Sequence, residues 1–362
     1  MLYHLLYPLR DTFFAFNIFR YITVRAVGAS LTAFLMSLIL APVVINLLRR
    51  FKIGETIRRE HVEGIYSLHM QKAGTPTMGG IFILGAIIIS VLLWADLANR
   101  YILLVLISTA WLGIVGFIDD YIKIVNRDKR GLSAATKFSG QVLLGILVGV
   151  ILLLDVHIST KLNIPFFKNL TVDLGAFYIL FATLVIVGTS NAVNLTDGLD
   201  GLAVGCVSIV AITYAVISYV TGNIKFADYL LINYIPGAGE LTVFCAAMVG
   251  ACMGFLWFNS YPASVFMGDV GALALGGAVG VVAVCIKKEL LLVIVGGVFV
   301  IEAASVLLQV SSYKFRRKRI FLMAPLHHHL QMKGWAESKI VVRFWIIAIV
   351  LALFSLATLK LR

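Results

Sequence analysis

Long apolar runs separated by short polar segments make up almost the whole chain. Runs of about 18 residues or more recur, and each is long enough to cross the ~30 Å hydrocarbon core of a bilayer. A backbone inside lipid must satisfy its own hydrogen bonds, so spanning segments form helices or closed barrels. Barrel strands alternate apolar and polar residues, and runs such as residues 81–93 do not alternate. The pattern therefore predicts an all-α polytopic membrane protein.

The apolar runs predict about ten transmembrane helices in a single domain over residues 1–362. The spans cover roughly residues 23–48, 76–95, 101–118, 138–155, 173–192, 201–220, 240–258, 270–286, 290–310 and 340–359. Residues 1–22 are amphipathic, with aromatic side chains between Arg10, Asp11 and Arg20. We expect this segment to lie on the membrane surface as an interfacial helix. No internal repeat or linker divides the chain.

The composition excludes an ordinary soluble globular protein and changes the interpretation of the charge. Of the 362 residues, 60% are hydrophobic and only 13% are charged. A net charge of +12 would suggest a nucleic-acid partner for a soluble protein, but here the basic residues lie in short loops between spans. No basic surface interleaved with aromatic residues is present, so we expect no nucleic-acid partner. The four cysteines lie within apolar spans without a CxxC pair, which indicates packing.

The basic residues are distributed unequally between the two sides of the membrane. Residues 49–75, 119–137 and 311–339 follow odd-numbered spans and together carry eighteen Lys and Arg, against six in the opposite internal loops. The positive-inside rule places the eighteen in the cytoplasm, so both termini are predicted to be periplasmic. The acidic clusters and a histidine run lie on the cytoplasmic side too, which indicates a site that uses a water-soluble cytosolic substrate.

Two adjacent carboxylates, Asp119 and Asp120, end the third predicted span in the run GFIDDY. Neighbouring carboxylates repel each other and are stabilised beside a divalent cation or several lysines. Acids at the ends of hydrophobic spans are costly and commonly mark function. The alternative is a solvated span end beside Lys123. We favour a functional pair, because tyrosine and isoleucine flank it instead of polar residues.

The run NAVNLTDGLDG, residues 191–201, joins the fifth and sixth spans. It contains Asn194, Asp197 and Asp200, and the two acids would share one face of a helical turn. Oxygen and amide groups of this kind suit a hard cation or a nucleotide. The alternative is a simple capped turn.

Asp269 begins the eighth span within NSYPASVFMGDVG, residues 259–271. A single Asp at a helix N-terminus is often only a cap. As the third carboxylate on the same face, it is interpreted here as a magnesium ligand. Phe266 precedes it in a position to stack on a base, although an exposed loop Phe more often packs against its own protein.

His327, His328 and His329 follow Pro325 in a basic loop. Consecutive helical residues point about 100° apart, so the three cannot all ligate one metal. We expect one or two of them to contact phosphate or substrate. The run KAGTPTMGG, residues 72–80, places Lys72 among threonines and glycines, which weakly indicates a phosphate-binding loop without a Walker A sequence.

Taken together, GTPTMGG, FIDDY, NAVNLTDGLDGL, FNSYPASVFMGDVG and APLHHHLQMKGW resemble the bacterial phospho-N-acetylmuramoyl-pentapeptide-transferase family. The likeness runs from about residue 20 to the C-terminus. NLTDGLDG and MGD are shared across the wider polyprenyl-phosphate N-acetylhexosamine-1-phosphate transferase superfamily. The histidine triplet with KGW is more typical of the muramoyl-pentapeptide branch. Ser190 stands where many relatives carry glycine.

The resemblance implies a ten-helix, magnesium-dependent enzyme of the bacterial inner (cytoplasmic) membrane, commonly a homodimer, with its active site on the cytoplasmic face. It would transfer phospho-MurNAc-pentapeptide from UDP-MurNAc-pentapeptide to undecaprenyl phosphate, giving lipid I and UMP for peptidoglycan synthesis. Asp269 would be the magnesium ligand. Asp119 and Asp120 would be the essential catalytic pair, with Asp119 a candidate base or nucleophile. The implied substrate-site positions are Lys72, Lys123, Lys137, Asn194, Asp197, Asp200, Asn259, Phe266, His327, His328 and His329.

Other functions make different demands on the sequence. A sister transferase that loads GlcNAc-1-phosphate onto the polyprenyl phosphate would share most of these motifs. A secondary transporter would place ionisable residues near the bilayer midplane and show repeats, whereas here only Glu302 is a deep-looking acid. A scaffold protein has no need for five polar segments on one face.

Overall fold

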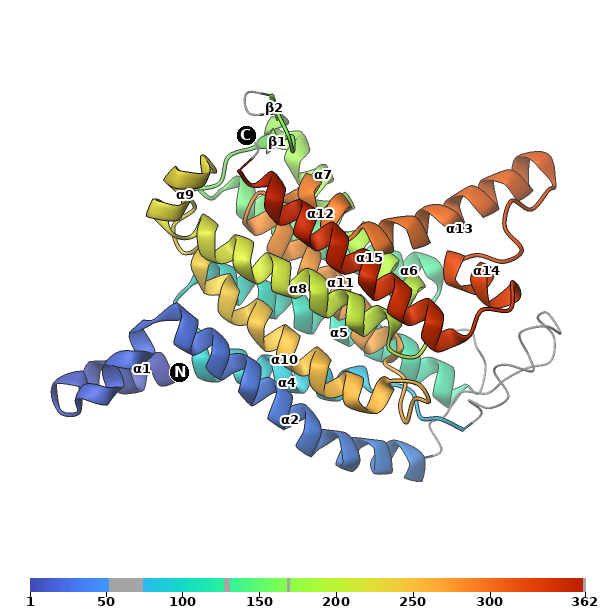
Figure 1. Ribbon diagram of the computed structural model, residues 1–362, viewed down its shortest axis with the longest axis horizontal. Coiled ribbons are helices and arrows are strands. Elements are labelled where there is room, and N and C mark those ends of the chain that lie inside the picture. Colours follow the sequence, from blue (N-terminus) through green and yellow to red (C-terminus); the bar gives the residue numbers. More distant parts are fainter. Residues whose placement is uncertain (52–73, 127–130, 168–169, 361–362) are drawn as a thin grey trace.

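Apolar helices form nearly all of the computed structural model, which describes residues 1–51, 74–126, 131–167 and 170–360 (Figure 1). Nine of the described helices are long and apolar enough to cross a membrane, and a shorter apolar helix, α4, covers Gly80–Trp94. The prediction of an all-α polytopic membrane protein is therefore confirmed. Its spanning helices are α2 (Ile22–Arg50), α5 (Arg100–Val125), α6 (Ala134–Leu153), α7 (Tyr178–Thr196), α8 (Leu202–Thr221), α10 (Leu241–Asn259), α11 (Gly268–Cys285), α13 (Gly297–Arg316) and α15 (Glu337–Thr358).

Two of the expected segments differ from a single continuous helix. The predicted span 290–310 is divided at Gly296 into α12 (Glu289–Val295) and α13. Residues 1–22 do not form one interfacial helix: they make α1 (Leu2–Leu6) and two 3-10 turns, Tyr7–Asp11 and Phe14–Arg20. Pro8 lies at the start of the first 3-10 turn and removes a backbone donor, and Phe13 is extended, so an α-helix cannot continue through the segment.

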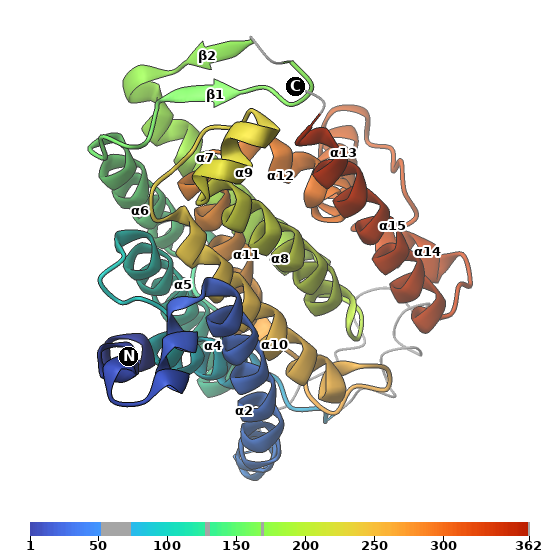
Figure 2. The same cartoon turned by 60° about the vertical axis from the view of Figure 1, so that its left-hand side comes forward.

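Helix α11 is the central helix of the bundle. It packs against α4, α5, α7 and α8, and α10 packs between α2 and α8 (Figure 2). Small residues allow this close packing: a Cβ atom added at Gly276 would lie 2.6 Å from the backbone oxygen of Thr189. Such contacts are typical of helix association in membranes, where apolar lipid gives little hydrophobic driving force. The four cysteines are free and buried, as predicted.

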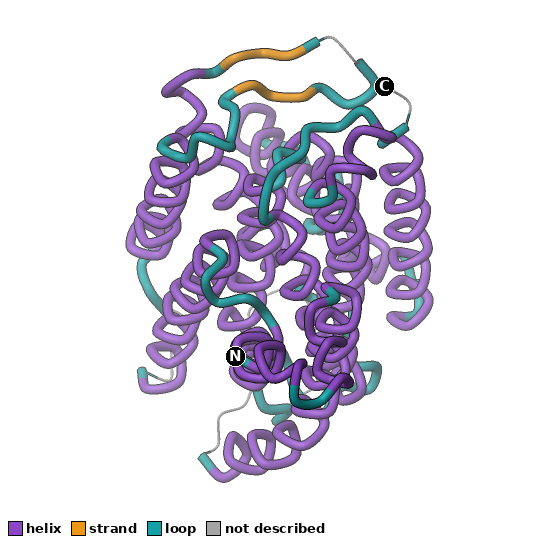
Figure 3. Tube along the Cα trace, turned by 90° about the vertical axis from the view of Figure 1, so that its left-hand side faces the viewer, coloured by secondary structure: helices purple, strands orange, loops and turns teal. Residues whose placement is uncertain are grey.

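The two ends of the bundle are built differently. One end carries a two-stranded hairpin, β1 (Lys161–Asn163) with β2 (Thr171–Asp173), and the short helix α9 (Ile224–Leu230), and the hairpin lies across the helix ends in Figure 3. Both chain ends lie there as well: the amino group of Met1 donates to Leu92 O, and Lys360 Nζ donates to Tyr229 O. The opposite end carries the polar turns and α14 (Leu326–Met332) (Figure 1).

Candidate active site

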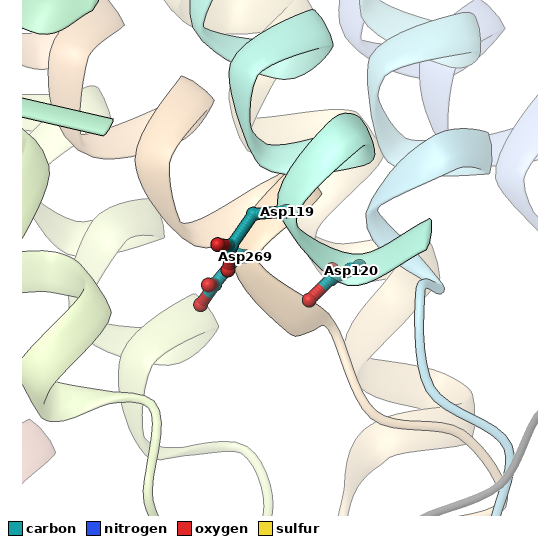
Figure 4. A group of neighbouring side chains, drawn as sticks. All are labelled: Asp119, Asp120 and Asp269. Carbon is teal, nitrogen blue, oxygen red and sulfur yellow. The ribbon is translucent and has the colours of Figure 1, made fainter. Parts of the chain in front are cut away.

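Three aspartates from two helices meet at the end of the bundle that carries the polar turns (Figure 4). Asp119 and Asp120 lie on the last turns of α5, and Asp269 lies on the first turn of α11. Carboxylate oxygens from all three lie within 4.8 Å of one another. Gly116 makes this possible, because a Cβ atom there would lie 2.3 Å from the backbone oxygen of Asp269. The backbones of α5 and α11 therefore lie in close contact one turn before the acidic pair.

Two lysines are held among these carboxylates. The ammonium nitrogen of Lys123 lies 2.5 Å from Asp119 Oδ2, 3.4 Å from Asp120 Oδ1 and 2.7 Å from Asp269 Oδ2. Lys137, on the first turn of α6, lies 2.7 Å from Asp269 Oδ2 and 3.6 Å from Asp119 Oδ2. Three carboxylates thus share two ammonium groups, which leaves the cluster with a formal charge of −1 when all five groups are ionised.

Backbone donors distinguish the three acids. Leu132 N donates to Asp119 Oδ1 at 2.8 Å, and Val270 N donates to Asp120 Oδ2 at 3.2 Å. Asp120 therefore accepts from the first turn of α11, as an N-cap does. Asp269 itself makes no capping bond in the described helix, and its carboxylate faces the two lysines. The interpretation of Asp269 as a mere cap is therefore wrong, and Asp120 takes that role.

The aspartate cluster is suited to a divalent cation. Mg²⁺ prefers hard oxygen ligands and is commonly bound by one or two carboxylates together with water and phosphate. The Lys123 ammonium marks the point that oxygens from all three acids approach, so the surroundings already stabilise positive charge there. The donor set and the residual negative charge both fit magnesium.

The turn between α7 and α8 is tied to the loop between α10 and α11. Asp200 Oδ2 accepts from Ala263 N at 3.0 Å, and Asp200 N donates to Glu337 Oε1 at 2.8 Å. Asn259 accepts from Gly201 N through Oδ1 and donates to Val265 O through Nδ2. Asp200 and Asn259 are both buried, so these two predicted substrate-site residues hold the turns together.

A third segment joins the same loop through its backbone. Phe266 N donates to Pro76 O, and Gly79 N donates to Phe266 O, each at 2.8 Å. The threonine- and glycine-containing segment thus lies beside the residues that lead into Asp269. Phe266 is half-buried, as are Asn194 and Asp197 near the end of α7. Lys72 lies outside the described residues.

The histidine run lies in the first half of α14, and its members have different surroundings. His327 is buried, whereas His328 and His329 are half-buried. His328 Nδ1 lies 2.8 Å from Gln331 Oε1. Leu322 N donates to His329 Nδ1, and burial together with Lys333 lowers the pKa of His329, so a neutral ring with its proton on Nε2 is favoured. The three histidines have different partners, and the expectation that one or two of them contact substrate stays a prediction.

Two contributors were not identified from the sequence. Gly116 is one of many glycines in apolar helices, and only the helix crossing shows why it must be small. Glu302 was noted as a deep acid, but its partner, His327, lies in a different segment 25 residues further along the chain.

Comparison with known proteins shows to which sequences the chain is similar. Residues 102–287 match the model of glycosyl transferase family 4, and residues 72–84 match signature 1 of phospho-N-acetylmuramoyl-pentapeptide-transferase. Proteins of that name from Pelobacter propionicus, Geobacter sp. (strain M21) and Koribacter versatilis are 57%, 55% and 52% identical to the chain. Each alignment covers all of both chains. The similarity therefore includes every segment that forms the site.

Proposed function

The chain belongs to the phospho-N-acetylmuramoyl-pentapeptide-transferase family, and from that premise we propose that it makes lipid I. It transfers phospho-MurNAc-pentapeptide from UDP-MurNAc-pentapeptide to undecaprenyl phosphate and releases UMP. The observation that carries this proposal is the cluster of Asp119, Asp120 and Asp269 with two lysines, placed at the end of a membrane-spanning bundle. A water-soluble nucleotide and a membrane lipid have to meet at such a boundary.

The aspartates would hold magnesium, with Asp269 as its principal protein ligand. Its carboxylate lies between two lysines and makes no capping bond in α11, so it is the acid least committed to holding the fold together. Bound magnesium would neutralise charge on the diphosphate of the nucleotide sugar. Asp119 and Asp120, which are themselves fixed by backbone donors, would help to position the metal ion.

Lys123 and Lys137 would bind phosphate oxygens as point charges. Both ammonium groups already lie among the carboxylates, where ion pairs hold them. Substrate phosphates would compete for these ammonium groups while a metal ion took over the carboxylates. We further assign Lys72, Asn194, Asp197, Phe266 and the histidines of α14 to the nucleotide and sugar, with Phe266 against the uracil. Asp200 and Asn259 would shape the site through the turns that they join.

We propose that the lipid phosphate attacks directly. A phosphate monoester has its second pKa near 6. The acceptor is therefore mostly dianionic at neutral pH, and a general base such as Asp119 would add little. A new phosphorus–oxygen bond forms to the lipid phosphate as the bond to UMP breaks. Rapid-quench trapping of a labelled phosphoryl-enzyme in the absence of lipid acceptor would instead establish a covalent route.

The orientation in the membrane is part of the proposal. The loops beside the aspartate cluster belong to the side with eighteen basic residues, which favours a cytoplasmic active site, periplasmic termini and location in the bacterial inner membrane. A homodimer is the oligomeric state that we expect from the family resemblance. Labelling of a cysteine at position 197 by an impermeant reagent in intact cells would contradict this orientation.

Substrate-dependent UMP release by the detergent-solubilised protein tests the function. We expect release with UDP-MurNAc-pentapeptide and undecaprenyl phosphate together, and none when either is omitted. UDP-GlcNAc serves as the matched donor. Turnover of UDP-GlcNAc but not of UDP-MurNAc-pentapeptide would identify a sister GlcNAc-1-phosphate transferase. No turnover of either donor would defeat the proposal.

A further inference from the structure

Glu302 of α13 is fully buried in the described structure, and so is the residue that it contacts. A carboxylate within an apolar helix of a membrane protein is costly unless it is hydrogen-bonded. Among the described residues, the carboxylate of Glu302 forms hydrogen bonds with His327. The backbone N–H of His327 donates to Oε1 at 3.2 Å and to Oε2 at 3.4 Å, and His327 Nδ1 lies 3.0 Å from Oε2.

The contact fixes both the backbone and the ring of His327. His327 N lies in the first turn of α14, and Pro325 before it provides no side-chain cap. Glu302 therefore supplies from another helix the acceptor that α14 lacks, as Asp120 does for α11. An ionised carboxylate only accepts hydrogen bonds, so the ring proton resides on Nδ1 and Nε2 carries a lone pair when the ring is neutral.

The other side of the His327 ring meets the turn between α7 and α8. A Cβ atom added at Gly198 would lie 2.3 Å from His327 Nε2, which is buried and has no hydrogen-bond partner among the described residues. The ring of His328 lies against that of His327, with centroids 4.2 Å apart. The ring of His327 thus connects Glu302, the turn that contains Asp197, and the next histidine.

We propose that Glu302 is a positioning residue for the substrate site. It orients His327, and through that ring and the first turn of α14 it sets the place of His328 and His329 relative to the turn at Asp197. This inference rests on the proposed function, in which α14 and the turn contact the nucleotide sugar. Glu302 itself is fully buried and would act only through His327, so its effect should be on binding of the donor.

Steady-state UMP release by Glu302→Gln tests the inference. The amide keeps the size of the side chain but replaces one acceptor by a donor, which opposes the proton on His327 Nδ1. We expect the KM for UDP-MurNAc-pentapeptide to rise roughly tenfold or more, because the change weakens a hydrogen bond to a charged group, with kcat close to that of the wild type. Gly198→Ala should raise the same KM, because it displaces the ring while Glu302 stays intact.

Two further variants separate positioning from general destabilisation. In the double variant Glu302→Gln/His327→Gln, the KM should be no higher than in whichever of the two single variants has the higher KM. The reason is that each change removes the same contact between Glu302 and His327. Glu289→Gln alters another buried acid, at the opposite end of the bundle, and should lower the thermal midpoint without raising the KM. A wild-type KM in both Glu302→Gln and Gly198→Ala, or additive effects in the double variant, would overturn the inference. Absence of UMP release by the wild-type protein would instead defeat the proposed function.

Discussion

The two ends of the helix bundle use charge in opposite ways. At the end with the hairpin, each buried carboxylate has its own cation. Arg25 donates two hydrogen bonds to Glu240, at 2.6 and 2.5 Å, and Lys287 lies 2.9 Å from Glu289. At the other end, Asp119, Asp120 and Asp269 share two lysines.

The difference shows which cluster is complete without a ligand. A bidentate arginine–carboxylate pair balances the charges of both partners and leaves no charge for a further ion. The Arg25 guanidinium also lies over the Tyr3 ring, and Asp96 N donates to Glu240, so this pair joins several segments. Acids outnumber cations in the aspartate cluster, so an added cation would stabilise it. Charge balance, more than burial, therefore distinguishes the candidate active site from the structural ion pairs.

The largest expected effect is on the unbalanced cluster. Asp269→Asn removes one negative charge without removing a backbone hydrogen bond that the structure describes, so the fold should persist. We expect UMP release to fall by about 10³-fold or more, the scale seen when a charged group at a phosphoryl-transfer site is removed. The thermal midpoint should stay near that of the wild type. Retained magnesium-dependent turnover in this variant would remove Asp269 from the metal site.

The next effect is on the balanced pair of Arg25 and Glu240. Glu240→Gln leaves the Arg25 guanidinium buried without its counter-charge, which costs about 3–5 kcal/mol of the free energy of unfolding. Denaturation in mixed micelles measures this loss. UMP release per folded molecule should be unchanged, since the pair lies at the opposite end from the aspartates. A specific activity that fell together with stability would show that the two ends are coupled.

A smaller effect is expected from Lys137→Met, which removes one of the two shared ammonium groups. The loss of a charged contact to phosphate should lower kcat/KM about ten- to a hundredfold. Lys161→Met at the hairpin serves as the matched control, with turnover like that of the wild type. Equal turnover in both variants would indicate that Lys137 only neutralises Asp269.

The smallest effect is expected from replacing a whole buried pair. Burial lowers the pKa of Lys287, an effect that Glu289 opposes, so the charged pair has a desolvation cost. Apolar substitution of both partners of such a pair is often neutral or stabilising by about 1–4 kcal/mol. Lys287→Met/Glu289→Leu should therefore keep or raise the thermal midpoint, whereas Glu289→Gln alone should lower it. A double variant less stable than Glu289→Gln would show that the pair stabilises the fold by more than the balance of its charges.

The sequence predicted the class of fold and the side of the bundle on which the polar groups gather. The length of an apolar run is a strong signal for a spanning helix. The number of preceding spans, together with the charge of the loops, assigns each loop to one side of the membrane. It did not predict the breaks at Gly296 and after Leu6, because a short apolar or amphipathic run looks the same whether or not its helix is continuous.

The site was predicted in part. The sequence identified Asp119, Asp120 and Asp269 together, since all three lie at span ends. It could not assign the cap to Asp120 instead of Asp269, nor pair Glu302 with His327, because both assignments depend on how separate helices cross. The amide of Asn259 joins two turns, which the sequence did not indicate, and its expected contact with substrate stays a prediction.

Binding of Mn²⁺ to the purified protein, measured by electron paramagnetic resonance as a substitute for Mg²⁺, tests the central claim most directly. We expect the wild-type chain to bind one ion and Glu289→Gln to bind it equally well, while Asp269→Asn binds it at least about tenfold more weakly. Equal binding by the wild-type chain and Asp269→Asn, or no binding by the wild-type chain, would contradict the claim that the unbalanced aspartate cluster is a metal site.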